Sequence, residues 1–126
     1  MYSEKVISGF FIILALTLNF GFVYGDLHNL ELHSKYELMA AIVVNLIATT
    51  MKLGDKTQMG SVLLATSFVA DIQLIASALV WGGSAIFISE ITPAVGATII
   101  SLAAGALVAN IVSVFLFIGE TLMLRR

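Results

Sequence analysis

Long runs of apolar residues, separated by short polar segments, make up most of the chain. Four such runs cover residues 5–25, 37–53, 58–81 and 93–123. A membrane-spanning helix needs about 20 residues, within a range near 17–25. The second run is short for a span, and the fourth is long enough to tilt or to emerge from the bilayer. Because lipid-exposed backbone must be hydrogen-bonded internally, the pattern predicts an all-α bundle of four membrane-spanning helices.

The ends of the first and last runs carry local signals. Thr92 precedes Pro93, which places a capping hydroxyl and then proline at the start of a helix. The first run follows Lys5 and is longer than the about 7–15 apolar residues of a secretion signal. It also lacks a small-residue cleavage site at its end. We therefore expect it to be retained as the first helix.

Composition strengthens the membrane interpretation. Of the 126 residues, 60% are hydrophobic and only 11% are charged, and the mean hydropathy is +1.05. Soluble domains have about 25% charged residues, so this chain is too poor in charge to cover a surface that faces water. A single transmembrane domain over residues 1–126 is expected. The net charge of −2 does not favour nucleic acid, and the absence of cysteine excludes disulfides and thiol chemistry.

The placement of lysine and arginine predicts an orientation. If all four runs cross the membrane, one side of the membrane holds five of these residues and the other side holds only Lys35. Positively charged residues favour the cytoplasmic side of a membrane, so both termini are predicted to be cytoplasmic. The five are Lys5, Lys52, Lys56, Arg125 and Arg126.

Small residues recur every four positions in the last run. Such a stripe lets the backbone of another helix approach closely, which predicts helix packing within the bundle or between subunits of a homo-oligomer. The stripe consists of Ala97, Ser101, Gly105, Ala109 and Ser113.

Asp71 is the acidic residue placed deepest in a predicted span. A carboxylate at the centre of a membrane helix costs about 2.5–3.5 kcal/mol on insertion scales, so it needs a partner, water, a proton or a cation. Ser67 lies one turn earlier on the same helix face. Two interpretations stay open, namely a cation or proton site and a hydrogen-bonded packing residue.

The other three runs each contain an asparagine, at Asn19, Asn45 and Asn110. In the same four-span arrangement Asn45 and Asp71 lie nearest the midplane, Asn19 toward the outer side and Asn110 toward the inner side. These residues either join helices through hydrogen bonds, which contribute about 0.6 kcal/mol each on average, or line a polar track across the bilayer.

The segment between the second and third runs resembles two known motifs. Leu53-Gly54-Asp55-Lys56-Thr57-Gln58 resembles the Glu-x-Gly-Asp-Lys-Thr motif of a family of small manganese and calcium transporters. In that family two facing motifs hold the cation through carboxylates, which would make Asp55 a cation ligand. Lys52 stands where the family has glutamate, and the chain has no second motif. The alternative is a structural turn built on Gly54, Asp55 and Lys56.

Residues Thr49 to Asp55 are also similar to a degenerate potassium-channel filter, Thr-Val-Gly-Tyr-Gly-Asp. Such a filter coordinates ions with backbone carbonyls, but Lys52 replaces its first glycine and Leu53 its tyrosine. A re-entrant segment here would leave three spans and place the termini on opposite sides. Whether residues 49–57 form a turn or a re-entrant segment stays open.

The polar segment after the first run carries His28 and His33 close to Asp26 and Glu31. These side chains are possible metal ligands, although solvated loops often contain the same residue types. No phosphate-binding loop, zinc motif or nucleophile motif occurs in the chain. We therefore expect neither an enzyme nor a bound cofactor.

Over its length the chain resembles small, uncharacterised families of bacterial inner-membrane proteins. That resemblance implies a multi-pass protein of the bacterial plasma membrane, with no activity to transfer. The residues favour cation movement by an oligomeric channel, a transporter or a subunit of a larger transport complex. The alternative is a non-conducting accessory or scaffold membrane protein.

Overall fold

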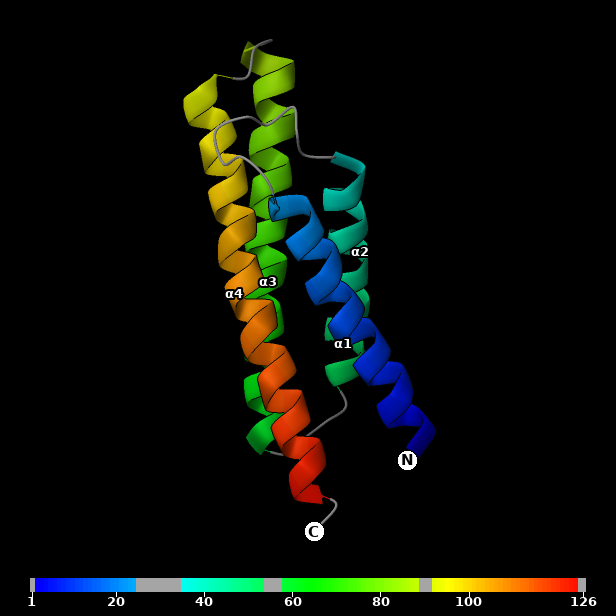
Figure 1. The fold of residues 1–126 in the computed structure, drawn as a ribbon. Helices are drawn as coiled ribbons and strands as arrows, with labels where there is room; N and C mark the ends of the chain where they lie inside the picture. The colour runs from blue at the N-terminus through cyan, green and yellow to red at the C-terminus, as the bar shows by residue number, and fades with distance from the viewer. Residues whose placement is uncertain (1, 25–34, 54–57, 89–91, 125–126) are drawn as a thin grey trace.

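The computed structural model describes residues 2–24, 35–53, 58–88 and 92–124, and their regular structure is entirely helical (Figure 1). The predicted all-α fold is therefore confirmed. The helices begin and end within a few residues of the predicted apolar runs. They are α1 (Tyr2–Val23), α2 (Lys35–Lys52), α3 (Gln58–Gly83), the π-helix η2 (Ser84–Ile88) and α4 (Pro93–Leu124).

Both ends of the connection between α3 and α4 follow from local chemistry. The Thr92 hydroxyl accepts a hydrogen bond from the Val95 amide at 3.2 Å, and the Thr92 carbonyl accepts one from Gly96 at 2.9 Å. This is the N-cap predicted for a helix that starts at Pro93. On the other side of the connection, the apolar segment after Gly83 extends α3 as the π-helix η2.

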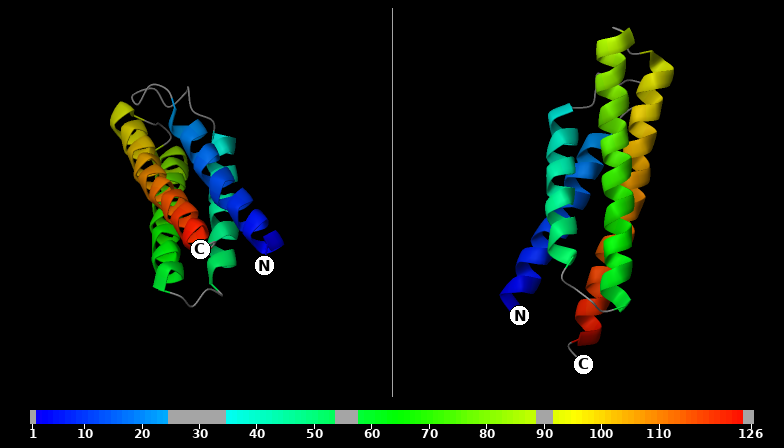
Figure 2. Two further views of the ribbon diagram at one scale, coloured as in Figure 1. Left: turned by 60° about the horizontal axis from the view of Figure 1, so that its bottom comes forward. Right: turned by 180° about the vertical axis from the view of Figure 1, so that it is seen from behind.

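The four helices form a ring in which each packs against two neighbours. The contact of α3 with α4 is the most extensive, followed by α1 with α2, α1 with α4, and α2 with α3. Both termini lie at one end of the bundle (Figures 1 and 2), which we call the terminal end. At 18 residues, about 27 Å, α2 is the shortest of the four. As a result, α3 and α4 extend past it at both ends (Figure 2).

A buried seam runs along every helix with alternating spacings of three and four residues. This heptad spacing is typical of helices that cross at a shallow angle in left-handed bundles. The seam consists of Ile12, Ala15, Asn19 and Phe22 in α1, Leu38, Ile42, Asn45, Thr49 and Lys52 in α2, Leu63, Ser67, Ala70, Leu74 and Ser77 in α3, and Ile99, Ala103, Ala106, Asn110 and Ser113 in α4. Most of the buried polar residues lie on it.

The outer surface of the bundle carries many large apolar side chains, such as Phe10, Ile72 and Phe115, which are 60–70% exposed. Among the described residues, three helical segments are long and apolar enough to cross a membrane, namely Val6–Val23, Gly60–Ile88 and Pro93–Leu122. The shorter α2 carries charges near both ends. An apolar exterior with most of the buried polar residues inside is opposite to the pattern of a soluble bundle, and it indicates a membrane protein.

The stripe of small residues in α4 crosses the buried seam at an angle. A spacing of four residues turns about 40° around the helix at each repeat. Ala109 and Ser113 therefore lie in the interior, whereas Ser101 is exposed and Ala97 is half-buried. Gly105 leaves room for the terminal amide of Gln73 of α3, because a Cβ atom there would meet that side chain.

Replacing Gly105 with leucine should destabilise the bundle. The new side chain must displace Gln73, and overpacking of this kind costs about 1–3 kcal/mol. The measurement is the thermal unfolding midpoint of each variant in detergent, with unfolding monitored by circular dichroism. Ser101→Leu is the matched control, because it adds an apolar side chain to the same helix at an exposed position. Equal midpoints for the two variants would show that the Gly105 contact does not hold α3 and α4 together.

Single cysteines introduced at Ser3 and Asn29 should label from opposite sides of the membrane. The chain contains no natural cysteine, so each variant reports one position. The expectation follows from the antiparallel order of the helices, because α1 carries the chain from one end of the bundle to the other. The readout is labelling of intact vesicles by a membrane-impermeant maleimide. Labelling of both positions from one side would contradict a membrane crossing by α1.

Candidate functional site

The side chain of Lys52, the last residue of α2, is turned into the bundle. Only 8% of the residue is exposed. Its Nζ atom donates hydrogen bonds to Ser67 Oγ of α3 at 2.5 Å and to Ser113 Oγ of α4 at 2.8 Å. The second bond crosses the diagonal of the helix ring. One ammonium group therefore joins three helices.

This position corrects the expectation that Lys52 is one of the charges at the cytoplasmic surface. Ser67 and Ser113 lie nine and eleven residues inside the nearer ends of their helices, which corresponds to about 13–17 Å. The ammonium group is therefore well inside the bundle. Lys52 follows Asn45 and Thr49 on the buried seam, and the apolar stem of lysine is long enough to carry the charge to the centre of the ring.

Asp71 of α3 lies beside Lys52 and is 6% exposed. Its Oδ2 atom accepts a hydrogen bond from the Thr49 hydroxyl at 2.6 Å, and the Lys52 charge interacts with the carboxylate. Among the described residues, the second oxygen, Oδ1, has no hydrogen-bond partner. The site thus combines a buried lysine, a buried aspartate and one buried carboxylate oxygen that has no hydrogen-bond partner among the described residues.

The Thr49 hydroxyl connects Asp71 to the backbone of α2. Its Oγ1 atom also lies 2.8 Å from the Asn45 carbonyl oxygen. A hydroxyl has one proton and two acceptor lone pairs. It can therefore donate to an ionised Asp71, or accept from a protonated Asp71 and donate to the Asn45 carbonyl. The same geometry serves both protonation states of the carboxyl group.

The structure brings Asn19 and Asn110 together, which corrects their predicted placement at opposite depths. In the amide orientation that satisfies its neighbours, Asn19 accepts a hydrogen bond from Asn110 Nδ2 at 2.9 Å and donates to the Ala103 carbonyl at 3.0 Å. These bonds join α1 to α4. Asn45 instead donates to the Ala41 carbonyl of its own helix at 2.9 Å.

The buried polar residues occupy only part of the bundle interior. Lys52 and Asn45 are seven residues apart in α2, so this polar segment extends over about 10 Å. Further from the terminal end, the interior is closed by an apolar plug of Phe22, Leu38, Leu74 and Ile99, each at most 1% exposed. The apolar side chains of the plug separate this polar segment from the buried Ser77 and Ser84 further along α3 and η2.

The potassium-channel resemblance is not supported over its first half. Residues 49–52 form the last turn of α2, and helical carbonyls point along the helix axis instead of toward a pore. The second half and the transporter-like motif, with Gly54, Asp55 and Lys56, lie outside the described residues, as do His28 and His33. In the part of the chain that the structure describes, no group of three His, Cys, Asp or Glu side chains is placed to hold a metal ion.

The Lys52–Asp71 pair should behave as one energetic unit. The two buried charges interact electrostatically, so removing one of them leaves the other buried charge less compensated. We expect Lys52→Met and Asp71→Asn each to lower the unfolding midpoint, and the double variant to lose less stability than the two single losses added together. A double-mutant cycle of unfolding free energies should give a coupling of about 0.5–3 kcal/mol. Additive losses would show that the two charges do not interact.

Comparison with known proteins gives a family without an activity. No curated protein and no solved structure is significantly similar to the chain. A family model described as "Family of unknown function (DUF6394)" matches residues 32–121, a range that contains α2, α3 and most of α4 and therefore the whole Lys52–Asp71 site. The chain belongs to this family of unknown function, DUF6394.

Proposed function

We propose that the protein moves cations across a membrane, and that the cation is the proton. The observation that carries this proposal is Asp71, which has an unpartnered carboxylate oxygen inside the bundle and next to the buried Lys52. Ionisable side chains at this depth are costly, and in membrane proteins they are concentrated along ion pathways and proton relays.

The groups around Asp71 favour a proton over a metal ion. A divalent cation such as Ca²⁺ or Mg²⁺ takes six or more oxygen ligands from carboxylates, carbonyls and waters. Here one carboxylate is available, and the Lys52 ammonium already supplies positive charge next to it. A proton needs a single acceptor, and the Thr49 hydroxyl accommodates Asp71 with or without it.

The apolar plug limits how such a proton travels. Hydrophobic constrictions close a pathway because water does not enter them. Movement past the polar segment therefore needs an opening of the plug or a path between subunits, so the proposal includes a homo-oligomer or a larger transport complex. With Lys52 inside the bundle, the lysine and arginine bias is four to one. It still favours cytoplasmic termini, in a multi-pass protein of the bacterial plasma membrane.

Purified protein in liposomes should dissipate an imposed pH gradient, and Asp71→Asn should reduce this flux to the level of empty liposomes. Asparagine keeps the shape of the side chain but does not exchange a proton near neutral pH. The readout is an internal pH-sensitive dye. Lys52→Met/Asp71→Asn provides a compensated variant that also lacks the carboxyl group, so a loss of flux there cannot come from an unpaired charge. Asp55→Asn is the matched control outside the described residues and should conduct like the parent.

Three results would contradict the proposal. Equal flux for the parent and Asp71→Asn would remove Asp71 from the pathway. A folded but inactive Asp55→Asn protein would move the cation site to the transporter-like turn. No flux of protons, potassium or manganese from the parent would favour the alternative function, a non-conducting accessory membrane protein.

A further inference from the structure

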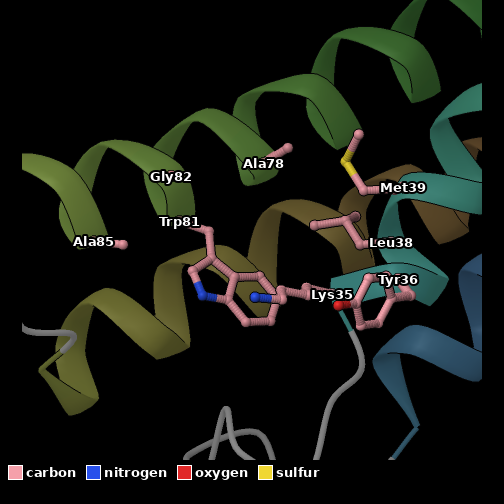
Figure 3. Close-up of a pocket in the computed structure, with 8 residues that line it drawn as sticks. All are labelled: Lys35, Tyr36, Leu38, Met39, Ala78, Trp81, Gly82 and Ala85. Carbon is pink, nitrogen blue, oxygen red and sulfur yellow. The ribbon is translucent and has the colours of Figure 1, made fainter.

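A pocket opens between α2 and α3 at the end of the bundle opposite the terminal end (Figure 3). Its volume is about 280 Å³. Lys35, Tyr36 and Met39 contribute the α2 wall, and Trp81 and Gly82 the α3 wall. The Trp81 ring packs against Phe22 of α1, whose ring centroid is 6.0 Å away. The pocket therefore combines an apolar lining with two aromatic side chains and one cation.

The pocket lies in a notch that the unequal helix lengths create. At this end α2 begins at Lys35, whereas α3 continues through η2 to Ile88. The apolar segment Gly60–Ile88 has 29 residues, about 43 Å of helix, which exceeds the about 30 Å hydrocarbon core of a bilayer. Beyond the notch, Ile86 and Phe87 are 74% and 86% exposed. A short helix beside a long apolar one leaves a gap that lipid must fill.

Among the described residues that line the pocket, the charge comes from Lys35 and has a defined direction. Lys35 lies with its Nζ atom 5.8 Å from the centroid of the Tyr36 ring, and Figure 3 shows its side chain on the Trp81 side of the α2 start. The nearby acid, Glu37, is turned toward α1, because a Cβ atom on Gly21 would meet its side chain. Lys35 is thus the charged group among those that line the pocket.

We propose that this pocket binds one anionic phospholipid, with the lipid phosphate against Lys35 and an acyl chain along the α2–α3 groove beside Met39. Lysine binds phosphate as a point charge. Tyrosine and tryptophan occupy the level of the lipid headgroups in membrane proteins. The three side chain types at the notch, cationic, aromatic and apolar, thus match the three parts of a phospholipid.

Trp81 provides a direct test because it is the only tryptophan in the chain. Phospholipids brominated in their acyl chains quench tryptophan fluorescence at short range. At equal mole fractions in liposomes, brominated phosphatidylglycerol should occupy the site with about fivefold preference over brominated phosphatidylcholine, the effect of one lysine near a membrane surface. Lys35→Gln should abolish the preference and Lys35→Arg should keep it. Lys5→Gln, in the terminal half of α1, should also keep it.

A pair of adjacent glycines tests the pocket itself. Neither Gly82 nor Gly83 has an atom within 4 Å of an added Cβ, but Gly82 lines the pocket and Gly83 does not. Gly82→Leu should therefore remove the preference for phosphatidylglycerol, whereas Gly83→Leu should retain it. Circular dichroism melts establish that each variant is folded.

Each contrary result overturns the proposal. Equal quenching by the two lipids in the parent, or an unchanged preference in Lys35→Gln, would show that Lys35 does not select an anionic lipid. The same loss in Gly82→Leu and Gly83→Leu would show that the pocket is not the site. Abolition of the preference by inorganic phosphate would assign the site to a free anion instead of a lipid. Cross-linking of the notch to a second copy of the chain would assign it to a subunit contact.

Discussion

The buried ammonium group of Lys52 is the constraint that fixes the register of three helices. An ammonium group has three donors and no acceptor, and lipid offers no partner to a polar group that remains unsatisfied. The bundle supplies Ser67 from α3 and Ser113 from α4, together with the charge of Asp71. A slip of α2 by one turn, about 5.4 Å, would remove these partners together.

The same constraint explains why polar and apolar residues divide the interior between them. The polar segment can lie only where α2, α3 and α4 are close enough for lysine to reach two serines. Beyond Asn45 the seam returns to large apolar side chains, with Phe22 and Leu74 fully buried. The main polar contact there is Ser77, which donates to the Ile99 carbonyl at 2.7 Å and links α3 to α4. The plug therefore stabilises the bundle by packing, and the polar segment specifies how the helices align.

The helices were predictable from the sequence because hydropathy reports burial in lipid, which determines where each helix starts and ends. The site was predictable only in part. Asp71 and Ser67 stood out because polar residues inside an apolar run are conspicuous. Lys52 did not, because a lysine at the end of a run is usually a surface anchor. A heptad reading would have found it, since residues 38, 42, 45, 49 and 52 lie on one face.

The depth of each polar residue was harder to predict than its presence. The sequence-based arrangement of four spans assigned membrane depths to Asn19 and Asn110 by counting residues from the ends of straight helices. Helices that differ in length and tilt do not keep this count, and α4 is 32 residues long whereas α1 has 22. The stripe of small residues at every fourth position of α4 predicted the packing seam only in part, for a related reason. A packing seam must follow a spacing near 3.5 residues to stay on one face, so only part of a strict four-residue repeat lies on it.

These observations make α2 the element on which both candidate sites depend. Its two ends carry Lys35 and Lys52, and as the shortest helix it has the smallest apolar surface to fix its depth in a bilayer. The hydrogen bonds of Lys52 hold one end, and the proposed lipid at the notch holds the other. If the proposed lipid at the notch displaces α2 along its axis, the rigid helix would also displace Lys52 at its other end. Linkage then requires any such effect to be reciprocal. Lipid binding at the notch and proton binding at Asp71 would each change the free energy of the other by the same amount.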